Sequence, residues 1–165
     1  MFSTSWHGDR GAGEALVATR DRSGWGFPYH SPMVCTRRVW LFAPVGSLFA
    51  LDVALTLLGQ DPDYWSGALH TANEANPIAR PLLATNPWLF AGLAVLWASV
   101  LAAVIVAWES RWSNLLAILV AFGHALGGSS WLLRTGDWGF ALAGGYLVLA
   151  AQFCFWCWKK GTVQP

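Results

Sequence analysis

One acidic residue, Asp52, falls inside a long apolar stretch of the 165-residue sequence. A carboxylate in the hydrocarbon core of a membrane costs about 2.5–3.5 kcal/mol on insertion scales unless it is paired or hydrated. Asp52 therefore needs a partner. A carboxylate in this position can accept hydrogen bonds, exchange a proton or bind a metal ion.

A second group of polar residues occupies the segment EANPIARPLLATNP, at 74–87, between two apolar stretches. Asn followed by Pro is typical of a helix start, because the Asn side chain caps free N–H groups and Pro fills the first helical position. The segment therefore predicts a short re-entrant or interfacial helix over about 77–84 and a long helix after the second Asn-Pro pair. The positive end of the short helix, or its Arg80, is available to hold Glu74 or Asp52.

Histidine and carboxylate residues also permit a metal site. His70 and Glu74 are four residues apart and share one face if that segment is helical. With Asp52 and His124, they could supply nitrogen and oxygen ligands to zinc or iron. The spacing matches no known metal motif. A polar network without a cofactor is therefore favoured, and the zinc or iron site is the alternative.

Four apolar stretches must position these residues. With 55% hydrophobic residues, 12% charged residues and a mean hydropathy of +0.42, the composition is typical of a membrane protein. The net charge of +1 argues against a nucleic-acid partner. Each stretch is long enough to cross about 30 Å of hydrocarbon at about 1.5 Å per residue. The prediction is an all-α four-helix transmembrane bundle in a lipid bilayer, covering residues 39–158, with spans at about 39–59, 88–108, 114–133 and 138–158.

These spans set the depth of the two ionisable groups. Counted from the span ends, Asp52 lies about 10 Å and His124 about 14 Å below the same boundary, so the two could face each other. Small and polar residues form one stripe on each helix, and such stripes are expected on buried faces. The stripes are Asp52, Thr56 and Gly59; Gly92, Ser99 and Ala103; His124, Gly128 and Trp131; and Ala141, Gly145 and Gln152.

The flanking basic residues predict the orientation. An even number of spans puts both termini on one side. That side holds eight of the ten Lys and Arg residues, and the other side holds only Arg80 and Arg134. The positive-inside rule then places both termini in the cytoplasm, with the protein in the cell (inner) membrane and the 60–87 loop outside.

The two ends of the chain are predicted as cytoplasmic tails. Residues 1–38 are polar, lack periodicity and are expected to be disordered, and a short tail covers 159–165. Met33 opens a short cationic lead into the first span. Met33 is therefore an alternative start of translation. If translation starts there, residues 1–32 are a spurious extension.

The twelve tryptophans favour the same layout. An indole prefers the headgroup level of a membrane, and most of the tryptophans fall at predicted span ends. Trp97 alone lies in the middle of a span. An interfacial role is therefore favoured over the alternative, in which the rings stack on a pigment or a sugar.

Part of the sequence resembles a known family. The residues concerned are Asp52-x-x-x-Thr56, the helix-closing Gly59, and Glu74-x-Asn76-Pro77 before a short apolar segment. Over about residues 40–110 they resemble the small prokaryotic membrane proteins catalogued as domain of unknown function 5658. That family brings no established activity. The resemblance implies that five residues of this sequence form one cluster with a shared structural or functional role. They are Asp52, Thr56, Glu74, Asn76 and Pro77.

Two classes of function stay open. In the first, the protein is a non-enzymatic accessory or scaffold protein, within a larger membrane complex or a homo-oligomer, and its polar cluster locks the outer loop to the bundle. In the second, the cluster is the site of a metal-dependent reaction or moves an ion or a proton. The first is favoured, because the spans hold one acidic group and show no inverted repeat. No catalytic residue is assigned, and the cluster comprises Asp52, Thr56, Glu74, Asn76, Pro77, Arg80 and His124.

Overall fold

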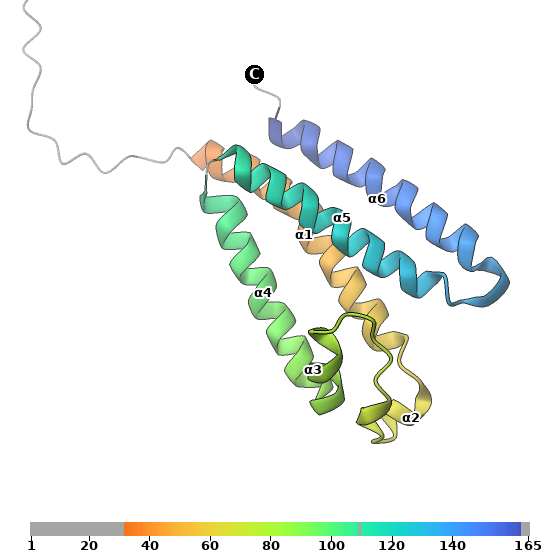
Figure 1. Cartoon of the computed structure of the whole chain (residues 1–165). Helices are drawn as coiled ribbons and strands as arrows, with labels where there is room; N and C mark the ends of the chain where they lie inside the picture. Colours follow the sequence, from red (N-terminus) through yellow and green to blue (C-terminus); the bar gives the residue numbers. More distant parts are fainter. Residues whose placement is uncertain (1–31, 109, 163–165) are drawn as a thin grey trace, which may run out of the picture.

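The computed structural model describes residues 32–108 and 110–162 and contains no strand in these ranges. Each of its four long helices is long and apolar enough to cross a membrane. The predicted all-α four-helix transmembrane bundle is therefore confirmed. The long helices are α1 (Pro32–Leu58), α4 (Pro87–Ala107), α5 (Arg111–Leu132) and α6 (Gly139–Thr162) (Figure 1).

Successive long helices run antiparallel, and α1 packs against all three others (Figure 1). Helix α5 also packs along α6, whereas α4 meets α5 over only a short stretch and diverges from it. The start of α1 and the end of α6 lie at one end of the bundle, called here the terminal end. The loop between α1 and α4 and the turn between α5 and α6 lie at the opposite end, the loop end.

The main core lies where α5 crosses α1. Ala117, Ala121 and Ala125 recur every four residues along α5, so one small face of this helix approaches α1 closely. Larger side chains from α1 and α4 fill the remaining space. They are Leu41, Val45, Leu48, Leu101 and Ile105.

Arg38 closes the terminal end of α4. Its Nη1 atom lies 2.9 Å from the carbonyl oxygen of Ile105, 2.8 Å from that of Trp108 and 2.8 Å from Oγ of Ser113. The last carbonyls of a helix have no partner within the helix, and a basic side chain can satisfy them. Arg38 therefore joins the end of α4 to the start of α5.

Three short helices shape the loop between α1 and α4: α2 (Pro62–Trp65), η1 (Leu69–Thr71) and α3 (Ala79–Thr85). Buried Gln60 fastens this loop to α1. Its Nε2 donates to the carbonyl of Thr56 (2.8 Å), and its Oε1 accepts from the backbone N–H of Asn73 (2.8 Å). Tyr64 is fully buried, and its hydroxyl donates to the carbonyl of Leu83 in α3 (3.0 Å).

The helices extend past the predicted spans into both predicted tails. Residues 32–38 belong to α1, so the disorder expected there was wrong, and residues 159–162 continue α6. A helix continues past the apolar region because its backbone hydrogen bonds still form at headgroup level, where aromatic and basic side chains are stable. Lys160 Nζ, for example, lies 5.4 Å from the centre of the Trp156 ring. The predictions for residues 1–31 and 163–165 lie outside the described residues.

The small and polar stripes are buried on only two helices. Thr56 in α1, and Gly128 and Trp131 in α5, are buried as predicted, whereas Asp52 and His124 are half-buried and Gly59 is exposed. The stripes of α4 and α6 are exposed, so the prediction for them was wrong. Helix α4 meets α1 through Leu101 and Ile105, and α6 buries residues spaced seven apart. The exposed residues are Gly92, Ser99, Ala103, Ala141, Gly145 and Gln152, and the buried ones of α6 are Ala143, Ala150 and Cys157.

Candidate functional site

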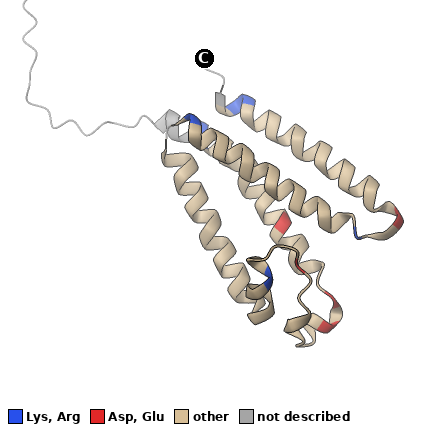
Figure 2. Ribbon diagram, viewed as in Figure 1, with Lys and Arg blue, Asp and Glu red and all other residues tan. Residues whose placement is uncertain are grey.

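Asp52 and His124 form a hydrogen-bonded pair inside the membrane-spanning part of the bundle. Figure 2 shows the charged residues gathered near the two ends of the bundle, apart from one acidic position within α1, which is Asp52. Its Oδ2 lies 2.9 Å from Nδ1 of His124 on α5. The two side chains are 20% and 24% exposed, respectively. The structure thus brings together the two groups whose predicted depths were similar.

The residues around the pair fix its geometry. A Cβ atom at Gly127 would lie 2.7 Å from both carboxylate oxygens of Asp52, so only glycine allows this approach to α5. On the other side, the ring of Phe49 packs edge-on against the imidazole, with ring centres 4.6 Å apart. The pair is therefore held between the backbone of α5 and an aromatic ring of α1.

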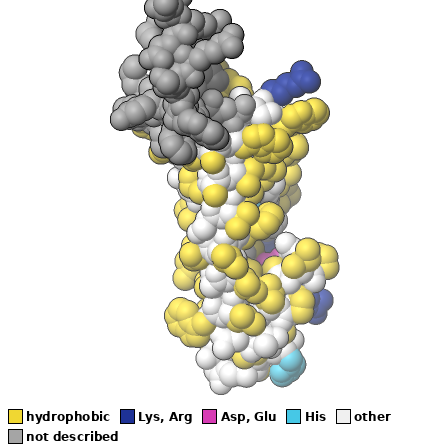
Figure 3. Space-filling model, turned by 90° about the vertical axis from the view of Figure 1, so that its left-hand side faces the viewer, with side chains coloured by type: hydrophobic (Ala, Val, Ile, Leu, Met, Phe, Trp, Pro, Cys, Tyr) yellow, Lys and Arg dark blue, Asp and Glu magenta, His cyan; other side chains and the backbone are white. Residues whose placement is uncertain are grey.

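A cavity of about 790 Å³ adjoins the pair. It is bounded by α1, α4, α5, α3 and the loop before α3, and most of its lining is apolar. Figure 3 shows one face of the molecule, with many hydrophobic side chains along it and a small acidic patch among them. The polar side chains in the cavity lining are Asp52, Thr56, Glu74, Asn76, His124 and Ser130.

Five of the predicted site residues, Asp52, Thr56, Glu74, Asn76 and His124, line this one cavity. The backbone N–H of Asn76 donates to Oε1 of Glu74 (2.8 Å), and Oδ1 of Asn76 accepts from the N–H of Ile78 (2.9 Å). Asn76 therefore caps the turn that leads into α3, although the helix proper begins later than predicted. Asn86 caps α4 as predicted, through the N–H groups of Trp88 and Leu89.

The other three predicted residues, Pro77, Arg80 and His70, lie away from the cavity. His70 is exposed on η1, and residues 72–76 are not helical, so the condition for a face shared with Glu74 is not met. Arg80 is exposed, and within the described ranges the carboxylate of Asp52 pairs with His124 instead. An exposed guanidinium stays hydrated, which costs less than entering an apolar cavity.

The cavity offers few metal ligands. Among the described residues, no three His, Cys, Asp or Glu side chains lie together in a group that could hold a metal ion. Asp52 and His124 could supply two ligands, whereas zinc sites in proteins use three or four protein ligands. The expectation that no cofactor is needed stays a prediction.

The serine hydroxyls on α5 near the pair are already engaged with the helix backbone. Ser130 lines the cavity, but its hydroxyl donates to the carbonyl of Gly127 (2.7 Å). The hydroxyl of Ser129 donates to the carbonyl of Leu126 (2.8 Å). A nucleophilic mechanism requires a hydroxyl or thiol in contact with the base. The geometry instead suits hydrogen bonding, proton exchange and binding of a positive group.

Sequence reasoning missed the residues that hold the loop over the cavity. Arg134 Nη1 donates to Oδ1 of Asn73 (3.1 Å), and its guanidinium lies 4.3 Å from the centre of the Trp131 ring. A side chain at Gly59 would collide with the same ring, so this glycine lets α5 pack against the end of α1. Gln60 directly follows Gly59, the glycine after the last turn of α1. This position is the sequence feature that could have indicated that Gln60 fastens the loop to α1.

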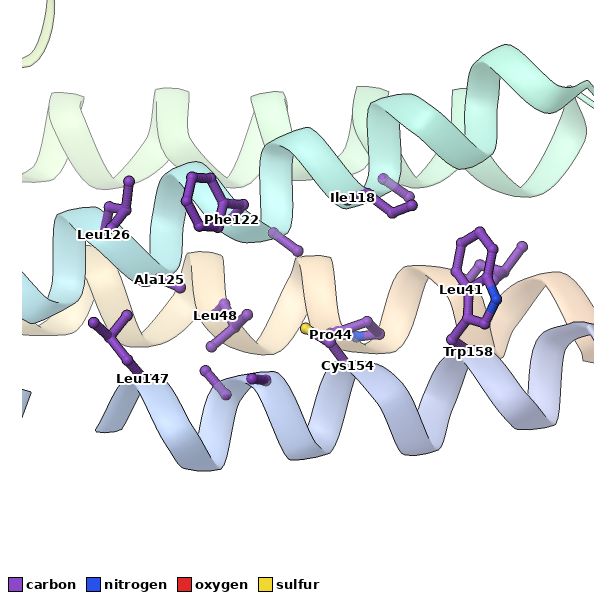
Figure 4. A pocket seen from close by; sticks show the side chains of 14 residues that line it. Leu41, Pro44, Leu48, Ile118, Phe122, Ala125, Leu126, Leu147, Cys154 and Trp158 are labelled. Carbon is purple, nitrogen blue, oxygen red and sulfur yellow. The ribbon is translucent and has the colours of Figure 1, made fainter. Parts of the chain in front are cut away.

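A second cavity, of about 430 Å³, lies between α1, α5 and α6 (Figure 4). The side chains in Figure 4 include Leu41, Pro44, Phe122 and Cys154, and the lining contains no acid and no histidine. Half-buried Cys154 and buried Cys157 are small packing side chains in this region. This lining offers only the indole N–H of Trp158 and the thiol of Cys154 as polar groups of its side chains, so the first cavity, with its carboxylates and histidine, is the candidate site.

No family model, curated protein or solved structure matches the chain. The resemblance to domain of unknown function 5658 therefore stays a prediction. The function has to be argued from the geometry of the cavity alone.

Proposed function

We propose that this multi-pass membrane protein is a non-enzymatic binding protein for a lipid-soluble amphiphile, which occupies the cavity between α1, α4 and α5. The observation that carries the proposal is the cavity of about 790 Å³ with a mostly apolar wall and the Asp52–His124 pair in that wall. Ligand pockets are typically about 300–1,000 Å³, largely apolar, with a few polar groups that orient the ligand.

A ligand from the bilayer can reach this cavity from the side. Helix α4 meets α5 over only a short stretch, and Trp97 on α4 lines the cavity while 54% of its surface is exposed. The loop end is closed by the bonds of Gln60, Tyr64 and Arg134 described above. The loop thus acts as a fixed cover, in keeping with the favoured accessory or scaffold class.

Movement of an ion or proton across the membrane has less support. Between the pair and the terminal end, the core of the described bundle consists of Leu48, Val45 and Leu41 on α1 and alanines on α5. A conduction path needs polar groups or water along its length. The pair can exchange a proton within the cavity, and no polar side chain of this core continues the path.

We also propose that the protein lies in the cell (inner) membrane with both termini in the cytoplasm. From Met33 onward, five basic residues flank the terminal end and two flank the loop end. This difference supports the orientation by the positive-inside rule. The cavity then lies in the outer half of the membrane.

Self-association through α6 is a further part of the proposal. Gln152 is exposed on a face of α6 where Gly144 and Gly145 have no neighbouring atoms within 4 Å of a Cβ position. An amide in lipid gains from a partner helix, and small residues let that helix approach. Cross-linking in membranes should detect a dimer that Gln152→Leu weakens. Equal cross-linking of both forms would contradict this contact.

Co-purification of a ligand tests the binding function. Gly123 lines the cavity and has open space at its Cβ position, so Gly123→Leu should fill the cavity without a backbone clash. Gly92→Leu is the matched control, because Gly92 is exposed, has the same open space and does not line the cavity. Mass spectrometry of organic extracts should find one amphiphile with the native protein and Gly92→Leu, and little with Gly123→Leu. Equal amounts with all three proteins would contradict the proposal.

A further inference from the structure

We infer that the ligand is a lipophilic cation, that is, a hydrophobic molecule with an ammonium or similar positively charged head. This inference rests on the proposed binding function and adds the chemical class of the ligand. It follows from the charge of the cavity wall, from the carboxylate oxygens that remain available, and from the aromatic rings in the same wall.

The wall of the cavity is negative. It contains the carboxylates of Asp52 and Glu74, and none of the described residues that line it is Lys or Arg. His124 is the one lining side chain that can carry a positive charge, and it is already bonded to Asp52. Even with His124 protonated, two carboxylates face one imidazolium. The wall therefore favours a positive ligand and disfavours a negative one.

Each carboxylate keeps one oxygen available. Asp52 uses Oδ2 for His124, and Glu74 uses Oε1 for the N–H of Asn76. The second oxygens, Oδ1 of Asp52 and Oε2 of Glu74, take no hydrogen bond from the described residues. An ammonium head beside either of these oxygens would satisfy an acceptor that otherwise faces an apolar cavity.

Two aromatic rings can cover the rest of a cation. Trp97 and Phe90 line the cavity from α4. The ring of Trp131 is already covered by Arg134, and Phe49 packs on His124, so these two rings are occupied. A cation over an aromatic face is attracted by the ring quadrupole, and tryptophan is the strongest partner. This gives Trp97, the one tryptophan predicted in the middle of a span, a role that interfacial anchoring does not explain.

The competing ligand classes fit less well. A neutral alcohol of the same length could fill the apolar part of the cavity and donate one hydrogen bond, but it gains no charge pairing. An anionic head would have to enter beside two carboxylates without a free basic side chain in the lining. We expect a cation to bind about tenfold or more tightly than its neutral analogue, as cation–π and charge-assisted contacts of desolvated groups imply.

Fluorine NMR of the full chain can measure this preference. The protein is labelled with 5-fluorotryptophan, held in dodecyl maltoside micelles, and titrated separately with decyltrimethylammonium, decanol and decyl sulfate. The Trp97 signal is assigned with Trp97→Phe. Glu74→Gln removes one carboxylate from the non-helical loop segment, and Asp52→Asn removes the other. Gly123→Leu fills the cavity, and Gly92→Leu is its control.

We expect the cation to shift the Trp97 signal saturably. Its half-saturation concentration should be about one tenth or less of that of decanol. Glu74→Gln and Asp52→Asn should each reduce this difference. If decanol or decyl sulfate binds as tightly as the cation, and Glu74→Gln changes nothing, the ligand class is wrong while the binding function stands. If none of the probes shifts Trp97, or if all shift it equally in Gly123→Leu, the binding function itself is wrong.

Discussion

The closest test of the site geometry is the substitution Gly127→Ala. The added Cβ would lie 2.7 Å from both carboxylate oxygens of Asp52, which is closer than real Cβ atoms come to other atoms. The carboxylate must then move away from α5, and its bond to Nδ1 of His124 must lengthen or break. Gly123→Ala is the matched control, because it lies one turn earlier on the same helix with no atom within 4 Å of the new Cβ.

The expected size of the effect follows from these contacts. Replacing a helical glycine by alanine stabilises the helix by about 1 kcal/mol, and both variants gain this term. Overpacking and the strained hydrogen bond between Asp52 and His124 should destabilise Gly127→Ala by about 1–3 kcal/mol, a loss that Gly123→Ala does not have. The difference between the two variants corresponds to about 2–12 °C in melting temperature for a chain of this length.

Thermal unfolding in dodecyl maltoside, followed by tryptophan fluorescence, measures this difference. The same substitutions in an Asp52→Ala background complete a double-mutant cycle, because the carboxylate that collides is then absent. We expect Gly127→Ala to melt below Gly123→Ala in the native background and close to it in the Asp52→Ala background. Equal melting temperatures in the native background would refute the described contact between Asp52 and α5.

Three further predictions concern the pair, the loop and the orientation. Asp52→Leu leaves Nδ1 of His124 without a partner and should lower the free energy of unfolding by about 1–3 kcal/mol. Asp52→Asn keeps an acceptor and should lower it by less. If Asp52→Asn melts below Asp52→Leu, the pairing of Asp52 with His124 is contradicted. Burial raises the pKa of Tyr64 above its ordinary value of 10.0. The neutral hydroxyl therefore makes its full contribution to the stability of the fold below pH 10.0, and this contribution is lost as the pH rises through the pKa of the folded state. Tyr64→Phe should therefore melt below the native protein near neutral pH. Above pH 10 the native protein should lose more stability than this variant, which has no hydroxyl to ionise. Parallel pH profiles of the two melting temperatures would contradict a stabilising role of the Tyr64 hydroxyl. In a background without other cysteines, a cysteine at exposed Ser66 should react with an impermeant thiol reagent from outside the cell, and labelling only from the cytoplasmic face would reverse the proposed orientation.

The spans and the depth of the hydrogen-bonded pair could be predicted because hydrocarbon imposes strong rules. A span must be apolar and long enough to cross the bilayer, and a carboxylate inside it must find a partner. These two rules place Asp52 and His124 at similar depth without knowledge of the packing. The caps at Asn76 and Asn86 could be predicted for a similar reason, because the first N–H groups of a helix need acceptors close by in the sequence.

The packing faces and the loop could not be predicted in the same way. Lipid is as apolar as Leu or Ala, so the pattern of a lipid-exposed helix does not distinguish its buried face. The stripes of α4 and α6 were therefore placed on the wrong faces, with Gln152 on an exposed one. The loop depends on contacts between distant residues, such as Arg134 with Asn73, and no local pattern encodes them. The cavity likewise results from the divergence of α4 from α5.

Photolabelling tests the central claim, that a membrane-soluble ligand occupies the cavity between α1, α4 and α5. The probe is a decyltrimethylammonium analogue with a diazirine in its chain, and the labelled residues are identified by mass spectrometry. We predict labels on cavity-lining residues such as Val53, Leu93 and Trp97, lost in Gly123→Leu and kept in Gly92→Leu. Labels spread over exposed residues of α6 such as Leu149 and Phe155, and unchanged in Gly123→Leu, would contradict the account.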